Sequence, residues 1–567
     1  MQKFSELEYK RPSIKTTKKK YAALLKEFKA AADYEHAKAA YLKIDEFDAE
    51  LSTTFVIASV RNTMNTADEF YDGEMKFLNR AAPSLIPLQK KMLTALLNTK
   101  FRPDFEKEFG THMFSDPEID LKLANKKIIF NLMRESFLCN DYKKAAAACS
   151  ADFRGEKCNF YGLLKHMEAA DREERKEAFL AWGNLYKNAA PKLDKIYNKL
   201  VKLRRKMAKK LKLRDYIEMA YLGKHRVDYT RDDVAKFREQ VVKYLVPACE
   251  QLRQKQAERI GVEKLKYYDE TFFFPDGNPN PVGTAKELVE KAQKMYRELS
   301  PESGEFFDFM VEYELFDLET RPGKHLGGYC TSLSEYKAPF IFSNFNGTSA
   351  DVDVLTHEAG HALEGYLASR CQPIPAYYIS TSEINEIHSM SMEHFTYPWM
   401  ESFFGENADK YRFAHLTQAL LTIPYIVCVD EFQHKVFEAD KTDAGSRRKI
   451  WHELEQKYLP WRDYDGFDFL EEGGFWMQKQ HIFLYPFYYI DYSLAAMGAF
   501  EFYQKMLADR KAAWEGYLNL CKAGGSKGYF ELLKLAGLSN PFEEGTVQKI
   551  VETVMDEIGK AEKQYSK

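Results

Sequence analysis

The sequence predicts a mainly α-helical protein that contains one small β-sheet. Between Tyr21 and about Tyr221, apolar residues recur three and four positions apart, which is the spacing of amphipathic helices. Strand patterns are confined to residues 327–346, where GGYCTSL and FIFSNFNG flank the turn-like SEYKAP. Because 567 residues are several times the commonest domain size, we expect two lobes: a helical one at residues 1–200 and a catalytic one at 201–567.

Proline and glycine mark the expected breaks between helices. Arg102-Pro103 and Ala190-Pro191 indicate turns, and Thr271 to Thr284 (TFFFPDGNPNPVGT) indicates a loop. After the strand region, Ser349 with two aspartates behind it is typical of a helix N-cap. We expect that helix, DVDVLTHEAGHALEGYLASR, to end at Cys371 and a second helix, SEINEIHSMSMEHF, to begin near Ser382.

The charge balance gives no reason to expect nucleic acid or an anionic membrane as a partner. Lys and Arg number 82 against 85 Asp and Glu, so the formal net charge is only -3. The basic stretch from Lys202 to Arg214 interleaves leucine and methionine among its charges, as a helix with one solvated face does. Local sites must therefore determine which molecules bind.

Several features favour a cytoplasmic protein. The opening MQKFSELEYKRPS lacks the apolar core of an export signal, and we expect no later stretch to be apolar for long enough to span a bilayer. The eight cysteines contain no CxxC pair. Reduced, buried thiols fit this scatter better than a disulfide framework or a cysteine zinc site.

The chemistry is concentrated in the HEAGH pentapeptide. His357 and His361 lie four residues apart, so on a helix they share a face and can bind one zinc ion. Glu358 is rotated about a quarter turn away from the first histidine, which places it beside the metal, where a base is needed to take a proton from zinc-bound water. From the composition of the chain, only about 0.04 matches to the pattern His-acid-x-x-His are expected by chance, so chance is a weak explanation.

A catalytic zinc site needs a third protein ligand, because three ligands leave a position open for water. The following helix offers Glu383, Glu386, Glu393, His388 and His394. Periodicity alone leaves the choice open. Glu386 and Glu393 lie seven residues apart and share a face, which allows one to bind metal while the other accepts a hydrogen bond from a ligand histidine.

The HEAGH helix, with EIHSMSME beginning 25 residues after its second histidine, resembles the thimet oligopeptidase and oligoendopeptidase F family of zinc metallopeptidases. It is most similar to the shorter bacterial members, such as the Pz-peptidases. Glu386, Ser389 and Glu393 occupy the family pattern E-x-x-S-x-x-x-E. The resemblance, from about Arg321 to about Phe500, implies Glu386 as third ligand and Glu393 as a partner of His357. It also implies a neurolysin-like zincin fold, in which two helical lobes flank a deep substrate channel.

Two further regions are candidates for holding the substrate. The family carries a histidine and paired tyrosines near its C-terminus, so QKQHIFLYPFYYIDY implies His481, Tyr488 and Tyr492 as catalytic residues and Tyr485 and Tyr489 as substrate contacts. A tyrosine-rich core helix is the alternative. In the strand region, Gly327 and Gly328 either allow a peptide to approach the sheet edge or merely relieve a turn.

We therefore expect a zinc-dependent endopeptidase that hydrolyses short peptides, with one Zn²⁺ per chain and Glu358 as general base. The oligomeric state stays open. One alternative is a di-iron carboxylate oxidoreductase, since Glu358 with His361 and Glu431 with His434 both form Glu-x-x-His pairs. A second alternative, a non-catalytic peptide-binding protein with structural zinc, gives Glu358 no role.

Overall fold

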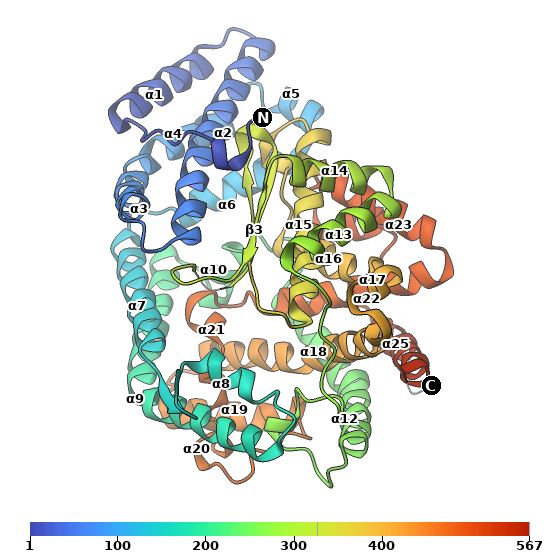
Figure 1. Ribbon diagram of the computed structural model, residues 1–567. Helices are drawn as coiled ribbons and strands as arrows, with labels where there is room; N and C mark the ends of the chain where they lie inside the picture. Colours follow the sequence, from blue (N-terminus) through green and yellow to red (C-terminus); the bar gives the residue numbers. More distant parts are fainter. Residues whose placement is uncertain (326, 566–567) are drawn as a thin grey trace. The chain divides into compact units, whose positions relative to one another are not determined.

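The computed structural model describes residues 1–325 and 327–565 and is dominated by α-helices, as predicted (Figure 1). Residue contacts divide the chain into two compact units. The first unit comprises Met1–Lys122, Asn280–Ala408 and Glu501–Ser539, and the second comprises Leu123–Pro279, Asp409–Phe500 and Asn540–Lys567. The lobe boundary at residue 200 stays a prediction, and α9 (Arg172–Leu211) runs without a break through that position.

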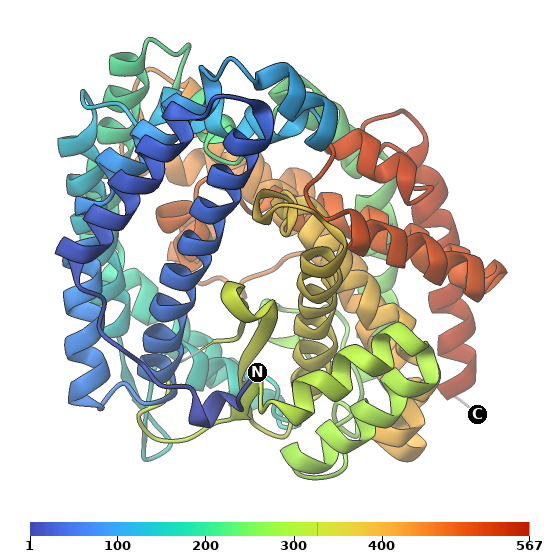
Figure 2. The ribbon, with the colours of Figure 1, turned by 90° about the horizontal axis from the view of Figure 1, so that it is seen from above.

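The first unit contains helices from the N-terminal, central and C-terminal parts of the chain. They are α1 (Ile14–Ala30), α2 (Tyr34–Met64), α3 (Glu69–Ala81), α4 (Ile86–Leu97), α5 (Arg102–Phe109), α6 (Ser115–Leu123), α13 (Ala285–Leu299), α14 (Pro301–Glu312), α15 (Ala350–Cys371), α16 (Ser382–Phe395), α17 (Met400–Phe404), α23 (Arg510–Ala523) and α24 (Tyr529–Leu535). The α1 and α2 helices lie side by side, as the dark blue ribbons show (Figure 2).

A three-stranded sheet in the first unit has the order β3-β5-β4. The strands are β3 (Phe316–Glu319), β4 (Tyr329–Leu333) and β5 (Ala338–Phe345). The central β5 is almost wholly buried and pairs parallel with β3 and antiparallel with β4. The predicted strand region is confirmed, and β3 is an addition to it. Because β4 lies at an edge of the sheet, one side of its backbone pairs with no strand among the described residues.

The two helices expected after the sheet begin and end close to the predicted residues. The α15 helix packs on β4 and β5 and also against α16 and α23. Residues on most of its circumference are buried, as in a helix that is enclosed by neighbours. Ser349 precedes the helix but makes no side-chain cap; instead, Asp351 accepts hydrogen bonds from the backbone N–H groups of Asn346 and Gly347.

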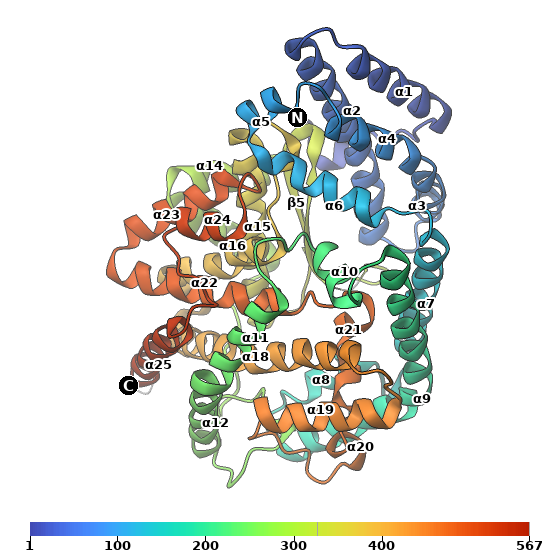
Figure 3. The ribbon, with the colours of Figure 1, turned by 180° about the vertical axis from the view of Figure 1, so that it is seen from behind.

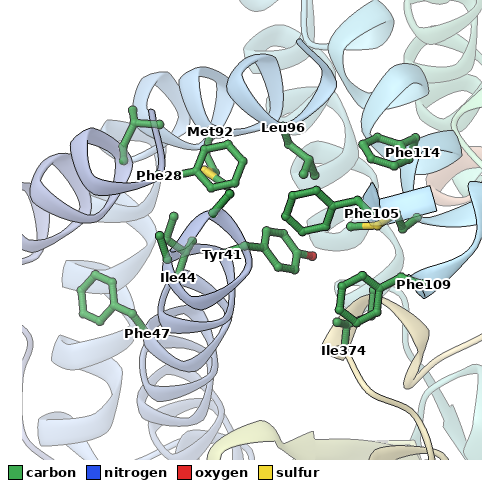
Figure 4. Packing of buried hydrophobic residues seen from close by; sticks show 14 of the residues in the cluster. Phe28, Tyr41, Ile44, Phe47, Met92, Leu96, Phe105, Phe109, Phe114 and Ile374 are labelled. Atoms are coloured by element: carbon green, nitrogen blue, oxygen red, sulfur yellow. The ribbon is translucent and has the colours of Figure 1, made fainter. Parts of the chain in front are cut away.

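A cluster of aromatic and aliphatic side chains joins the N-terminal helices to the segment that follows α15 (Figure 4). Phe105 is fully buried at its centre, with its ring centroid 5.1 Å from that of Tyr34 and 5.8 Å from that of Tyr41. Ile374 and Tyr377 belong to the same cluster, and the Tyr377 hydroxyl donates to the Phe109 carbonyl at 2.7 Å. This packing anchors the chain just beyond the HEAGH helix.

The second unit is also mainly helical. Its elements are β1 (Ala151–Phe153), β2 (Glu156–Cys158), α7 (Ile129–Ala147), α8 (Phe160–His166), α9, α10 (Tyr216–Leu222), α11 (Arg231–Gln240), α12 (Val246–Ile260), α19 (Ala444–Tyr458), α20 (Asp468–Glu471), α21 (Gln480–Leu484) and α25 (Thr546–Tyr565). Residues from both units contribute to α18 (Ala408–Glu438) and α22 (Ile490–Ala508). The α7 and α9 helices lie side by side (Figure 3).

The α9 helix shows where a prediction from sequence is wrong. Ala190-Pro191 does not form a turn, because Pro191 lies inside this 40-residue helix. Proline removes one backbone hydrogen bond, but Trp182 before it and Tyr197 after it are both buried, so packing maintains the helix. By contrast, the amphipathic interpretation of the basic stretch is confirmed: Leu203 and Met207 are buried, whereas its lysines are mostly exposed.

One stretch, Ser382–Glu438, contains a window that is long and apolar enough to cross a membrane. We expected no stretch to be apolar for long enough to span a bilayer, and the composition of this one shows that the expectation is wrong. However, 72% of the window is buried inside the structure, which is the pattern of core helices. The stretch is thus weak support for a membrane-spanning segment.

Replacement of Phe105 by alanine tests the cluster in Figure 4. Loss of a fully buried ring is expected to lower the free energy of unfolding by about 3–5 kcal/mol, measured by denaturant titration with circular dichroism. Phe130→Ala is the matched control, because the Phe130 side chain is 84% exposed and should change stability little. Equal effects of the two substitutions would contradict the assigned core.

Candidate metal centre and active site

Three potential metal ligands converge in the first unit. His357 and His361 lie one turn apart on α15, and Glu386 approaches them from α16. The Glu386 Oε2 atom lies 3.3 Å from Nε2 of His357 and 3.6 Å from Nε2 of His361. One donor atom from each of the three residues lies within 4.8 Å of the others.

This donor set fits a zinc ion. Tetrahedral ligands at about 2.0–2.1 Å from zinc are separated from one another by about 3.3–3.4 Å, close to the two measured separations from Glu386 Oε2. Two imidazoles and one carboxylate are also a common ligand set of catalytic zinc, which leaves a fourth position for water or substrate. Other divalent ions accept the same donors, so the geometry itself identifies a metal centre and not one particular metal.

A close contact between two helix backbones holds this arrangement. A Cβ atom built on Gly360 would lie 2.6 Å from the His388 carbonyl oxygen and 2.6 Å from Ser389 Cα, so only glycine fits there. The Tyr517 hydroxyl of α23 donates to the same His388 carbonyl at 2.9 Å. Gly360 therefore lets α16 approach α15 closely enough for Glu386 to reach both histidines.

Further hydrogen bonds orient the ligand side chains. His357 Nδ1 lies 2.6 Å from Glu393 Oε1, which leaves Nε2 on the side of Glu386. The Ser389 hydroxyl donates to Glu386 Oε2 at 3.1 Å. A carboxylate on the second nitrogen of a ligand histidine is the usual way in which proteins fix its tautomer and ring orientation.

Sequence reasoning missed a second buried network next to the metal ligands. Glu364, on α15, accepts a hydrogen bond from the Ser380 hydroxyl at 2.6 Å and pairs with His388 Nδ1 at 3.1 Å. His388 is thus directed to Glu364 and is absent from the group of potential metal ligands. The signal was present in the sequence, because Glu364 lies seven residues after His357 and so shares its face of the helix.

Burial and hydrogen bonding shift the protonation equilibria of these groups in opposite directions. Burial by itself lowers the pKa of His357, but hydrogen bonds to Glu386 and Glu393 outweigh it and hold this pKa well above its ordinary value. Burial favours a raised pKa for Glu386, but its bonds to His357 and His361 hold that pKa well below the ordinary value. Glu386 is therefore an anion, as a metal ligand must be.

Glu358 responds differently to the same surroundings. Burial raises the pKa of its carboxyl, and the neighbouring His357 and His361 only partly offset the increase. Its Oε1 atom faces the start of β4: a Cβ atom built on Gly328 would lie 3.8 Å from it. Gly327 has a φ of 94°, which a turn requires, whereas a Cβ atom built on Gly328 would contact the Phe342 carbonyl oxygen at 3.4 Å as well as the carboxylate. The sheet edge thus adjoins Glu358.

The C-terminal aromatic residues form a cluster within the second unit. The His481 ring centroid lies 4.9 Å from that of Tyr489 and 5.9 Å from that of Tyr488, which is stacked on it. Tyr492 packs edge-on against Tyr488 at 5.3 Å. Tyr485 is 50% exposed. The cluster brings the predicted residues together, and their roles in catalysis stay predictions.

A strained turn positions this cluster. Phe487 is buried and has a φ of 62°, a left-handed conformation that costs energy in a residue with a side chain. The Gln433 side chain accepts from the Phe487 N–H at 3.0 Å, and Arg226 donates to the Phe487 carbonyl at 2.6 Å. Arg226 also pairs with the buried Asp491. The surrounding bonds thus impose the turn that precedes Tyr488.

The second Glu-x-x-His pair that a di-iron site requires, Glu431 with His434, is engaged in other contacts. Glu431 accepts hydrogen bonds from Lys457 and Tyr458, and His434 Nε2 lies 3.2 Å from the Tyr221 hydroxyl. Within residues 1–325 and 327–565, neither belongs to a group that is able to hold a metal ion. The geometry therefore gives no support to the oxidoreductase alternative.

Comparison with known proteins agrees with this geometry. Residues 4–124 match the model of the peptidase M3 N-terminal domain, and residues 165–552 match that of peptidase family M3. The chain is 24% identical to the group B oligopeptidase PepB of Streptococcus agalactiae serotype III (strain NEM316), over 88% of this chain and 86% of that protein. It is 22% identical to the oligopeptidase PepF of Bacillus subtilis (strain 168), over 94% of this chain and 82% of that protein.

Among solved structures, a Pz peptidase A with inhibitor superposes with a TM-score of 0.92 and 45% identity, over 98% of this chain and 99% of that chain. A mainly helical fold with this donor group and these similarities defines the class of the protein as a metallo-oligopeptidase. The chain belongs to peptidase family M3. The predicted family is confirmed, and the non-catalytic alternative is not supported.

Replacement of Gly360 by alanine is expected to separate α15 from α16 and to weaken metal binding at least tenfold, because the added methyl group meets backbone atoms at 2.6 Å. Metal content after dialysis against a weak chelator measures the effect. Gly365→Ala is the matched control on the same helix, since nothing lies within 4 Å of a Cβ built there. Unchanged metal content in Gly360→Ala would contradict the proposed spacing.

The raised pKa of His357 predicts how metal affinity depends on pH. A metal must displace the proton on His357, so affinity should rise about tenfold per pH unit while that proton is bound. The rise should continue above about pH 6.5, the ordinary histidine pKa, in competition titrations with a chromophoric chelator. Glu393→Gln removes one cause of the raised pKa and should end the rise at lower pH. A plateau in the unmodified protein near the ordinary value would contradict this interpretation.

Proposed function

We propose that this metallo-oligopeptidase is a zinc-dependent endopeptidase that cleaves short peptides, with Glu358 as general base. The observation that carries the proposal is the convergence of His357, His361 and Glu386 on one position, with the buried carboxyl of Glu358 on the adjacent residue of the same helix. When bound by these three ligands, zinc supplies a Lewis acid that polarises the substrate carbonyl and lowers the pKa of water to about 7.

The surroundings of Glu358 suit the transfer of a proton. Its carboxyl is buried, and burial raises its pKa above the ordinary value of a glutamate, which strengthens the carboxylate as a base. The Glu358 carboxylate accepts the proton of the attacking water and then passes it to the nitrogen of the leaving amine. A carboxyl that is not itself a metal ligand can perform both steps, and Glu386 cannot, because His357 and His361 hold its pKa well below the ordinary value and keep it ionised.

The position of β4 at an edge of the sheet supports a mode of substrate binding. An extended peptide that pairs with the backbone of β4 uses main-chain hydrogen bonds, which are insensitive to side-chain sequence. The Gly328 backbone, just before this strand, then lies beside Glu358. The names of the oligopeptidases PepB and PepF support peptides as the substrate class.

The aromatic cluster supplies candidates for stabilising charge in the transition state. We assign His481, Tyr488 and Tyr492 as donors to the oxyanion, and Tyr485 and Tyr489 as contacts to substrate; support comes from the side chains gathered around His481. Donors of this kind share the negative charge that forms on the attacked carbonyl.

We also place the enzyme in the cytoplasm, since its eight cysteines are free, as expected in a reducing compartment.

Glu358→Gln tests the mechanism. This substitution keeps the size of the side chain and removes the base, so kcat should fall about 10²- to 10⁴-fold while zinc content stays unchanged, measured with a fluorogenic peptide and by metal analysis of the same sample. Glu290→Gln is the control, because Glu290 is an exposed residue of α13. Wild-type turnover by zinc-loaded Glu358→Gln would show that the base lies elsewhere.

A further inference from the structure

A second group of metal-ligand side chains lies on β2 and α8 of the second unit. Figure 1 labels α8 and the neighbouring α9. The two strands form an antiparallel hairpin whose turn residues, Arg154 and Gly155, have φ values of 49° and 86°. Such a two-residue turn is typical of short hairpins. The chain then enters α8, which is capped by Asn159 and ends at His166.

Strand and helix geometry bring three donors of different kinds together. Glu156 and Cys158 are two residues apart on β2, so their side chains lie on the same side of the hairpin. The α8 helix returns the chain so that His166 joins them. One donor atom from each of Glu156, Cys158 and His166 lies within 4.8 Å of the others.

The chemistry of this group differs from that of a cluster of surface acids. It combines a thiol, an imidazole and a carboxylate, which are the three side-chain types that bind zinc in proteins. Cys158 is buried, His166 is partly buried and Glu156 is exposed. The group thus has an inner side within the protein and an outer side that a metal ion can reach from solvent.

A neighbouring carboxylate orients the imidazole. Glu174 of α9 has its Oε1 atom 2.7 Å from His166 Nδ1, and its Oε2 atom accepts from Arg154 Nη1 at 2.8 Å. The second ring nitrogen, Nε2, is then the one available to a metal. His357 and Glu393 show the same relation in the catalytic group, and a carboxylate in this position is usual for metal-binding histidine. A simple His166–Glu174 ion pair does not explain why Cys158 and Glu156 face the same point.

We propose that Glu156, Cys158 and His166 bind a second divalent ion of intermediate softness, such as Zn²⁺. The ion fastens β2 to α8, and through His166 and Glu174 it adds to the attachment of the hairpin to α9. Such a function is structural, because a two-stranded hairpin is marginally stable by itself and because one ion bound by both elements links Cys158 on β2 to His166 at the end of α8. This site is separate from the proposed peptidase mechanism and does not depend on it.

Cobalt is a suitable probe, because a thiolate ligand gives Co²⁺ a near-ultraviolet charge-transfer band that nitrogen and oxygen ligands do not give. The catalytic group contains no sulfur, so Co²⁺ bound there does not give the band, and among the described residues Cys158 is the cysteine that belongs to a potential metal-binding group. Titration of the metal-free full-length protein should produce a band that saturates by two Co²⁺ per chain, because the catalytic group also binds Co²⁺. Zn²⁺, which binds such sites more tightly than Co²⁺, should remove the band.

Variants separate this site from the catalytic group. Cys158→Ser should abolish the band, whereas Cys149→Ser, a matched change of a half-buried cysteine in the same unit, should retain it. His361→Ala, which removes a catalytic ligand, should also retain it. Glu174→Gln should keep the band and weaken Co²⁺ binding about 10- to 100-fold. No band in the unmodified protein at saturating Co²⁺, or a band that survives Cys158→Ser, would overturn the proposal.

Discussion

The metal centre depends on one close contact, the approach of α15 to the backbone of α16 at Gly360. A side chain at this position would occupy the same space as the His388 carbonyl and Ser389 Cα. Because Glu386 lies two residues before His388, the distance between the helices directly sets the distance between its carboxylate and the two imidazoles. The bond from Tyr517 to the His388 carbonyl and the core around Phe105 then hold the helix pair in place.

Two glutamates of this site have pKa values that are shifted in different directions, and they therefore have different chemical roles. Glu358 and Glu386 are both buried, but Glu386 bonds directly to two imidazoles and keeps a low pKa, whereas burial dominates for Glu358 and raises its pKa. The surroundings of the two carboxyls therefore give them different roles: Glu386 stays an anion that is suited to bind a metal, and Glu358 can exchange a proton. Glu393 completes the arrangement, since its bond fixes the orientation of His357. The direction of each pKa shift depends on neighbouring side chains that are brought together only when the chain folds.

Local patterns were sufficient to predict the elements that carry the site. Helical spacing placed His357 and His361 on one face, and glycine, proline and strand alternation marked the loop and most of the sheet. The exact partners were not predictable. Helical periodicity left five candidates for the third ligand, and only family resemblance favoured Glu386. Pro191 was interpreted as a break, because the packing of Trp182 and Tyr197 that maintains α9 is not visible locally. The strands β1, β2 and β3 contain only three or four residues each, too few for a clear alternation, and with them the group around Cys158 escaped notice.

The central claim is that one ion is bound jointly by α15 and α16. Anomalous diffraction at the zinc absorption edge, from crystals of the zinc-loaded protein, tests it most directly. The account predicts a peak at about 2.0–2.2 Å from His357 Nε2, His361 Nε2 and a Glu386 oxygen. Zinc-loaded crystals with no peak between these three residues, or with a peak that Glu386 does not reach, would contradict it.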